Sequence, residues 1–351
     1  MISSTFPLLL ILLIILYYLK ESWGMVIHFG PCLIVFGDHM CPDSRISYYL
    51  FTRKNPIEPQ KIVIYERWDN ISLSNYNVSN PTKILIHGYN GNMFLEPLLE
   101  IKTEYLKQAD YNIWVVNWPS LCESPCYPMA AFNTRHAGAC VAQFIGRIQR
   151  LHPAPDLHVI GFSLGAHVAA FAAVHLRPYK LPRITGLDPA MPFFMTSNKD
   201  HKLDASDARF VDILHTNAFV QGKPDRCGHV DFYMNGGINQ PGCFQEGNPI
   251  GCDHHRSLRY FSESIRSEQG FWGWPCDGML AYLENRCPPR GEPCLMGAHA
   301  SPKSRGYQLV FTSAEKPFAL GRWSGVQTNR TRWQRLVRRR GGRNEIETYI
   351  V

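Results

Sequence analysis

The sequence predicts a single α/β domain built around a mainly parallel β-sheet. The main observation is that short apolar segments, rich in β-branched residues, alternate with segments of helical periodicity. The chain has 351 residues, 45% of them hydrophobic, which is enough for one large core. We find no internal repeat and no second long series of alternating strands and helices, so a second large domain is not expected.

Five segments have the composition of strands that are buried on both faces: 83–88, 112–118, 157–161, 183–188 and 209–215. Two helices are expected between them. Residues 133–151 carry apolar side chains at helical spacing, and 164–176 is a run of small and apolar residues. After His215 the segments are short and rich in glycine and cysteine, with one further strand-like run at 307–313. Strands that alternate with helices form parallel βαβ units.

The two ends of the chain differ from this pattern. Residues 1–24 have the features of a secretory signal peptide, because the apolar run from Phe6 to Leu19 is shorter than a helix that spans a bilayer. An uncleaved anchor is the alternative, since a basic n-region is missing. We expect the folded domain at 41–323 and a basic tail at 324–351, which carries much of the net charge of +7.

Cysteines and glycosylation sequons agree with secretion. Eleven cysteines in turn-rich surroundings, together with a leader, indicate disulfides formed in an oxidising compartment, and the odd number leaves one thiol unpaired. Asn70, Asn77 and Asn329 begin Asn-x-Ser/Thr triplets, the acceptor sites for N-glycans. The predicted location is therefore extracellular.

The stretch HVIGFSLGAHVA (158–169) contains a candidate nucleophile, Ser163, between Gly161 and Gly165. A serine that acts as a nucleophile here must stand on a sharp strand-to-helix turn, where side chains at the two glycines would collide with the strand and the helix. The N-terminus of the following helix favours a developing negative charge. The alternative is an ordinary turn in which the serine is only a cap.

A serine hydroxyl needs a base, and the base needs an orienting acid. Asp188 ends a predicted strand and would reach the same sheet edge as Ser163, although Asp-Pro is also a common turn. The base is expected in CDHHRS (252–257), after a cysteine-flanked loop, where spacing alone leaves His254 and His255 open.

The backbone N–H groups of Leu164 and Tyr89 are the expected oxyanion donors. His87, which belongs to the same ILIHGYN stretch as Tyr89, is expected to be a structural hydrogen-bonding residue, as are His215 and His229 in their strand-like segments.

Six motifs, in order, resemble the animal pancreatic-type lipase family: ILIHGYNG, HVIGFSLGAH, ITGLDPA, LDASDARFVDILHTN, GHVDFYMNGG and CDHHRS. The resemblance spans about 41–323. It implies the α/β-hydrolase fold and, position by position, Ser163 as nucleophile, Asp188 as acid and His254 as base. It also implies a calcium site with side-chain ligands Asp204 and Asp207 and backbone ligands Lys199 and Lys202, whereas two solvated aspartates are the alternative.

Departures from the best-known members suggest the substrate. The lid, residues 244–251 between Cys243 and Cys252, is far shorter than in triglyceride lipases, and the C-terminal β-sandwich is absent. This combination resembles the phospholipase A1 subgroup, including insect and venom members. We therefore expect a secreted serine esterase that hydrolyses the sn-1 acyl ester of phospholipids at a membrane or lipid surface.

Two alternatives remain: a neutral triacylglycerol or galactolipid lipase, and a non-catalytic lipid-binding or yolk-type relative. No cofactor is required, calcium being a candidate structural ion. No colipase and no nucleic acid are expected as partners. The basic tail is a candidate site for heparin-like polysaccharide or an anionic membrane, with a solvated tail as the alternative.

Disulfide pairing is expected partly from spacing and partly from the family. Cys243–Cys252 would tether the lid, and Cys276–Cys287 would close the loop after GFWGWP. Cys41 is expected to join Cys122 or Cys126.

Overall fold

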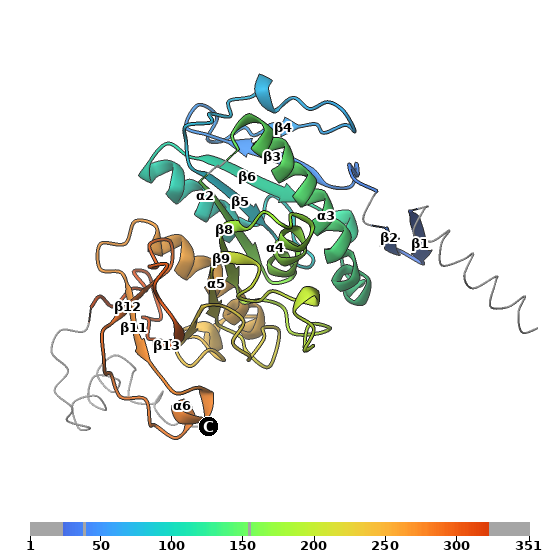
Figure 1. Cartoon of the computed structure of the whole chain (residues 1–351). Helices are drawn as coiled ribbons and strands as arrows, with labels where there is room; N and C mark the ends of the chain where they lie inside the picture. The colour runs from blue at the N-terminus through green and yellow to red at the C-terminus, as the bar shows by residue number, and fades with distance from the viewer. Residues whose placement is uncertain (1–23, 38–39, 154–155, 323–351) are drawn as a thin grey trace, which may run out of the picture.

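The computed structural model describes residues 24–37, 40–153 and 156–322. Eleven strands form one sheet in the order β12-β11-β13-β10-β9-β8-β7-β5-β6-β3-β4, and β1 and β2 form a separate hairpin (Figure 1). The strands are β1 (Met25–Phe29), β2 (Cys32–Phe36), β3 (Ser47–Phe51), β4 (Gln60–Ile62), β5 (Thr82–Ile86), β6 (Asn112–Asn117), β7 (Leu157–Phe162), β8 (Leu181–Leu187), β9 (Ala208–His215), β10 (Val230–Met234), β11 (Phe271–Pro275), β12 (Cys294–Met296) and β13 (Gly306–Val310).

The α-helices are α2 (Glu96–Gln108), α3 (Tyr127–Leu151), α4 (Leu164–His175), α5 (Pro249–Ser264) and α6 (Met279–Leu283). Short 3-10 helices are η1 (Ile71–Leu73), η2 (Pro119–Leu121), η3 (Lys199–His201) and η4 (Cys243–Gln245). The expected helix at 133–151 is confirmed, but it begins six residues earlier, where Pro128 stands in its first turn. The expected helix at 164–176 corresponds to α4.

The mainly parallel sheet is confirmed. From β6 through β5, β7, β8, β9 and β10 to β13, each strand is parallel to the next one in this series. At the two edges, β3 and β4 on one side and β11 and β12 on the other pair antiparallel. The five expected central strands are β5 to β9, and the run at 307–313 corresponds to β13.

Helices cover both faces of the sheet, which is why its strands are apolar along their whole length (Figure 1). On one face α3 and α4 pack against Ile84 and Ile86 of β5, and on the other α2 and α5 share a core with Leu85. Successive side chains of a strand point to opposite faces, so this alternation follows from strand geometry. The parallel arrangement brings the carboxyl ends of β5, β7, β8 and β9 to a single edge.

Four disulfides are formed: Cys32–Cys126, Cys41–Cys140, Cys243–Cys252 and Cys276–Cys287. The last two are the pairs that the sequence suggested. The expectation that Cys41 joins Cys122 or Cys126 is wrong. Cys126, at the start of α3, forms its disulfide with Cys32 of the hairpin, because β2 packs on that helix. Cys41 forms its disulfide with Cys140, farther along α3.

The expectation of one unpaired thiol is also wrong, because three cysteines of the described chain are free: Cys122, Cys227 and Cys294. The first two are buried, and burial raises the pKa of both thiols.

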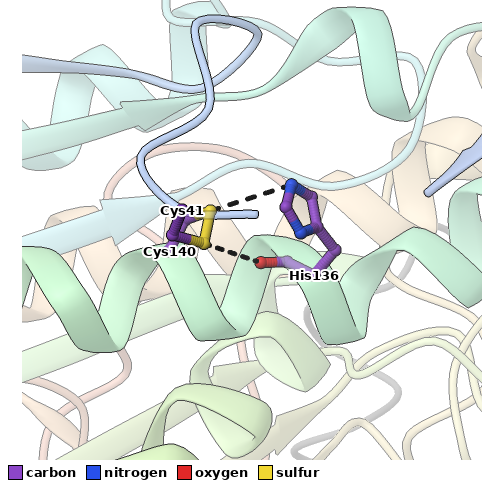
Figure 2. Close-up of side chains that lie close together, drawn as sticks. All are labelled: Cys41, His136 and Cys140. Carbon is purple, nitrogen blue, oxygen red and sulfur yellow. Dashed lines mark hydrogen bonds between the residues drawn. A yellow bond between two sulfur atoms is a disulfide. The ribbon is translucent and has the colours of Figure 1, made fainter. Parts of the chain in front are cut away.

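Figure 2 shows the Cys41–Cys140 disulfide and His136, which lies on α3 together with Cys140. The Nε2 atom of His136 lies 3.8 Å from Cys140 Sγ and 2.7 Å from a carboxylate oxygen of Asp43. The grouping of two cysteines and a histidine looks like a metal site, but the two sulfurs are covalently joined, so it serves as a crosslink of the N-terminal segment to α3.

The expected domain start at Cys41 is preceded by structure that belongs to the same body. The hairpin β1–β2 begins at Met25, and Val35 donates its N–H to the side chain of the buried Asn133 in α3. No helix within the described residues has both the length and the hydrophobicity to cross a bilayer. The expected leader up to Gly24 lies almost wholly outside the described residues, as do Asn329 and the basic tail.

Candidate active site

Ser163 stands on a strained turn between β7 and α4. Its backbone has φ 55° and ψ −118°, values that a non-glycine residue adopts only under constraint. A Cβ atom on Gly161 would lie 2.3 Å from the carbonyl oxygen of Gly165, and one on Gly165 would lie 2.3 Å from that of Ile86. The sequence prediction that side chains at both glycines would collide with the surrounding backbone is confirmed by this geometry.

Asp188 and His254 meet at the same sheet edge. His254 Nδ1 lies 2.6 Å from Asp188 Oδ2, while Asp188 Oδ1 accepts the backbone N–H groups of Thr216 (2.8 Å) and Asn217 (3.1 Å). Both side chains are buried. Because the carboxylate can only accept, Nδ1 carries the proton and Nε2 keeps its lone pair. This is the tautomer that a general base toward a hydroxyl requires.

His254 lies in the first turns of α5. Asn248 caps this helix by accepting the Gly251 N–H, and the Cys243–Cys252 disulfide ends within its first turn. The rings of Phe162, next to Ser163, and His254 are 4.6 Å apart. The helix and these contacts hold the imidazole at the serine turn.

His255 points to a different environment. Its ring stacks on Phe162, with ring centroids 5.3 Å apart. It also lines a groove of about 980 Å³ bordered by the lid, the start of α2 and residues 314–318. Burial, together with the nearby His254, lowers the pKa of His255 to about 4. Of the two adjacent histidines, His254 is the one that contacts Asp188.

The expected oxyanion donors flank Ser163. A Cβ atom on Gly88 would lie 2.6 Å from Ser163 Cβ and 3.2 Å from its Oγ, so the backbone of this loop passes directly beside the nucleophile. Leu164 is the first residue of α4, where an N–H has no partner within the helix. Within the described chain, the Tyr89 N–H likewise makes no hydrogen bond. Both groups are available to a ligand.

His87 orients the Tyr89 N–H from behind. Its Nε2 accepts the Trp118 N–H at 3.1 Å, so Nδ1 carries the proton and donates to the Gly88 carbonyl at 2.9 Å. Because the peptide plane is rigid and trans, fixing that carbonyl points the Tyr89 N–H the opposite way. Burial lowers the pKa of His87 to about 4, which keeps it neutral. His87 is thus engaged at both nitrogens, in agreement with the structural role expected for it.

Three residues that contact the Asp188 carboxylate were not predicted from the sequence. Thr216 and Asn217 follow β9 and provide the two N–H donors to Asp188, and Gly222 packs on its carboxylate. A Cβ atom on Gly222 would lie 2.4 Å from Asp188 Oδ1. The HTN motif (215–217) could have indicated Thr216 and Asn217, because it ends a strand that neighbours β8. No pattern in the sequence indicates a role for Gly222.

The histidines expected to be structural are hydrogen-bonded within the sheet. His215 lies 3.0 Å from Asp231 through Nε2 and 2.8 Å from the Lys223 carbonyl through Nδ1. His229 Nδ1 accepts the Val211 N–H. Both findings agree with the structural roles expected for them.

Two of the expected calcium ligands, Asp204 and Asp207, lie next to each other in the segment that follows η3. Asp204 and Asp207 are buried, and the Asp204 N–H donates to Asp207 Oδ2 at 2.9 Å. Asp204 Oδ2 and Asp207 Oδ1 have no hydrogen-bond partner. Burial, with the neighbouring Asp204 charge, raises the pKa of Asp207 to about 8. Lys199 and Lys202 frame η3, so their carbonyls are close in the chain to this acidic pair.

Of the glycosylation sequons, two lie in the described chain. Asn77 is exposed, whereas the Asn70 side chain is bound on both sides, accepting the Val63 N–H and donating to the Lys61 carbonyl. A glycan on Asn70 would be attached to the nitrogen that makes the second of these bonds.

The fold and the elbow-like serine turn define the class of α/β hydrolases. Residues 39–309 match the family model described as Lipase. Pancreatic lipase-related protein 2 of Cavia porcellus is 34% identical, over 83% of this chain and 66% of that protein. Lipase member H of Oryctolagus cuniculus is also 34% identical, over 74% and 58%, and pancreatic lipase-related protein 2 of Rattus norvegicus is 31% identical, over 88% and 70%. The chain belongs to the lipase family, a family of carboxylic ester hydrolases.

The chain spans less than two thirds of the length of the first two of these relatives. Among solved structures, alpha/beta hydrolase domain-containing protein 10 from mouse is 13% identical over 57% of this chain and 80% of that chain, with a TM-score of 0.31.

Proposed function

We propose that this protein is a secreted serine esterase that cleaves the sn-1 acyl ester of phospholipids. The observation that carries the proposal is the meeting of the Asp188–His254 pair with the strained Ser163 turn at one sheet edge. All three residues of a hydrolytic triad are present, which argues against the alternative of a non-catalytic lipid-binding relative.

In the proposed reaction, His254 Nε2 takes the proton of Ser163 as its Oγ attacks the ester carbonyl. Asp188 stabilises the imidazolium that forms, and the N–H groups of Tyr89 and Leu164 bind the oxyanion. The proton then passes to the leaving lysolipid alkoxide. Water hydrolyses the acyl-enzyme by the same route, with His254 again as base. No organic cofactor is needed for these steps.

The short lid supports the choice of phospholipid over triacylglycerol. The Cys243–Cys252 disulfide spans nine positions, and the last lid residues, from Pro249, already belong to α5. A segment so constrained can neither cover a wide groove nor supply much apolar surface. A polar head group would have room at the rim, whereas a third acyl chain would find little to grip.

Secretion is supported by the four disulfides, since such crosslinks persist in oxidising compartments. For the basic tail, whose residues lie outside the described ones, we keep the proposal of binding to heparin-like polysaccharide. We also propose that no colipase takes part.

Structural calcium is the second proposal for this chain. Two buried carboxylate oxygens without a partner, on Asp204 and Asp207, fit a hard cation that prefers oxygen ligands. The carbonyls of Lys199 and Lys202 would complete the set. When bound, the ion would neutralise the two carboxylates and hold the β8–β9 connection in place. It takes no part in the reaction.

The test of the activity uses a phospholipid with different labels at its two acyl positions, run beside a triacylglycerol emulsion. We expect fatty acid release mainly from sn-1, at a rate well above that from triacylglycerol. Faster triacylglycerol turnover, or release mainly from sn-2, would contradict the substrate choice and leave the serine hydrolase standing. No release from any ester would contradict the proposal as a whole.

A further inference from the structure

Two exposed phenylalanines adopt a backbone conformation that is unfavourable for bulky residues. Phe193 has φ 70° and Phe219 has φ 68°, and their side chains are 69% and 55% exposed. Glycine, asparagine and aspartate adopt this left-handed region most readily, whereas a phenylalanine there is an outlier. Neither ring compensates for this strain by being buried in the core, so the fold alone gives no reason for a phenylalanine at either position.

The two residues stand on loops that are bonded to each other. Met191 donates its N–H to the Gln221 carbonyl at 2.8 Å, and the Lys223 N–H donates to the Pro189 carbonyl at 2.9 Å. The buried Lys223 ammonium also donates to the Phe194 carbonyl at 2.8 Å. The loop after β8 and the loop after β9 therefore form one rigid unit.

Phe194, the residue after Phe193, anchors this unit to the core. Phe194 is buried and stacks on His167 with ring centroids 3.6 Å apart, while the Phe193 ring leans toward Tyr127 at 6.2 Å. Adjacent residues thus point in opposite directions. Four apolar side chains of the unit are left exposed: Phe193, Met195, Phe219 and Val220. We call them the acid-loop surface, because the two loops begin at Asp188 and at its amide donors.

The acid-loop surface lies beside the candidate active site and carries no charge. Gly222, in the second loop, packs on the Asp188 carboxylate. Neither 189–196 nor 216–222 contains a charged residue. An apolar surface without charges fits a lipid phase of zero net charge better than an anionic membrane or a polar protein partner.

We propose that the acid-loop surface docks the protein on a zwitterionic glycerolipid surface, with Phe193 and Phe219 inserted among the lipids. The inference rests on the proposed function, which requires Ser163 to take its substrate from such a surface. Insertion would compensate for the backbone strain by burying both rings. The proposal places the membrane-contacting side of the protein at the loops after β8 and β9. It does not place that side at the lid, although Phe244 of the lid is 84% exposed.

The test measures sedimentation with phosphatidylcholine vesicles in the Ser163→Ala background, so that binding is read without turnover. Phe193→Asn and Phe219→Asn keep a residue that tolerates the left-handed conformation and remove the apolar ring. We expect each to weaken vesicle binding by about tenfold, and the pair by about a hundredfold. Their thermal midpoints should not fall.

Ile57→Asn is the matched control. Ile57 is 79% exposed and follows β3, whose antiparallel pairing with β6 puts it at the opposite edge of the sheet. It should leave vesicle binding unchanged, and Phe244→Asn should weaken it by less than either acid-loop variant. With vesicles of phosphatidylcholine alone, added salt should have little effect on binding.

Unchanged binding in both acid-loop variants would overturn the proposal, as would a loss caused by Phe244→Asn alone or a fall in the thermal midpoints that accounts for the loss. A dimer that dissociates on Phe193→Asn, with vesicle binding intact, would identify a second copy as the occupant instead. Failure of the proposed function is seen separately, as absence of fatty acid release by the unsubstituted protein from a monomeric short-chain phospholipid.

Discussion

At the scale of single residues, the site depends on a few contacts around two side chains. His254 and His255 are adjacent, yet one touches Asp188 and the other stacks on Phe162 over a groove. We predict that Ser163→Ala and His254→Ala each reduce ester hydrolysis by a factor on the order of a thousand or more with the fold intact. His255→Ala should be much milder. Rates on a soluble ester, with circular dichroism as the control for folding, decide this, and a dead His255 variant beside an active His254 variant would reverse the assignment.

Gly222 provides a second prediction at this scale. An added methyl group would lie 2.4 Å from the Asp188 carboxylate, so Gly222→Ala should displace the acid from His254 and lower kcat by roughly a hundredfold or more. The matched control is Gly146→Ala in α3, where nothing lies within 4 Å of the new atom. It should keep full activity and stabilise the protein by about 0.5–1 kcal/mol. Full activity of Gly222→Ala would show that the contact is not needed.

At the scale of elements, the connection between β8 and β9 carries both the acidic pair and part of the docking surface. The raised pKa of Asp207 means that folding favours its protonated form. Without an ion, the cost of ionising Asp207 is absent below its unfolded pKa near 4 and grows as the pH rises toward about 8. Calcium would remove that cost by binding the ionised pair.

We therefore predict that calcium raises the thermal midpoint by several degrees at pH 8 and by much less at pH 5. Asp207→Asn should abolish the calcium effect and reduce the loss of stability between these pH values. Differential scanning calorimetry with calcium, magnesium or chelator is the measurement. Equal thermal midpoints in all three solutions at pH 8 would contradict the proposal that this protein binds calcium.

The disulfides of the whole molecule divide into two kinds. Cys41–Cys140 joins residues 99 positions apart, whereas Cys243–Cys252 joins residues nine apart. In the loop-entropy view, the first contributes about 5 kcal/mol and the second about 3 kcal/mol to the free energy of unfolding. Serine substitution of both partners in each pair, followed by urea unfolding, tests this order. We expect only the lid variant to change the ratio of triacylglycerol to phospholipid hydrolysis. A larger stability loss from the lid pair would contradict the ranking.

Local pattern was enough to predict the central strands, the helices α3 and α4, and the serine turn. The reason is physical: burial on both faces requires continuous apolar runs, and a crowded elbow tolerates only glycine at 161 and 165. The residues alone could not separate His254 from His255, because both share one stretch, and only the resemblance to lipases favoured the first.

The sequence by itself thus determined the central strands of the sheet, the serine turn and the family of this protein. Tertiary structure decided which side chains meet. The partners of Cys41 and Cys126, the amides that hold Asp188 and the need for glycine at 222 depend on contacts between segments far apart in the chain. Such contacts leave no local periodicity to read, since each is set by how helices and loops pack on the finished sheet. For the same reason, Phe193 and Phe219 became noticeable only when their backbone angles and exposure were known.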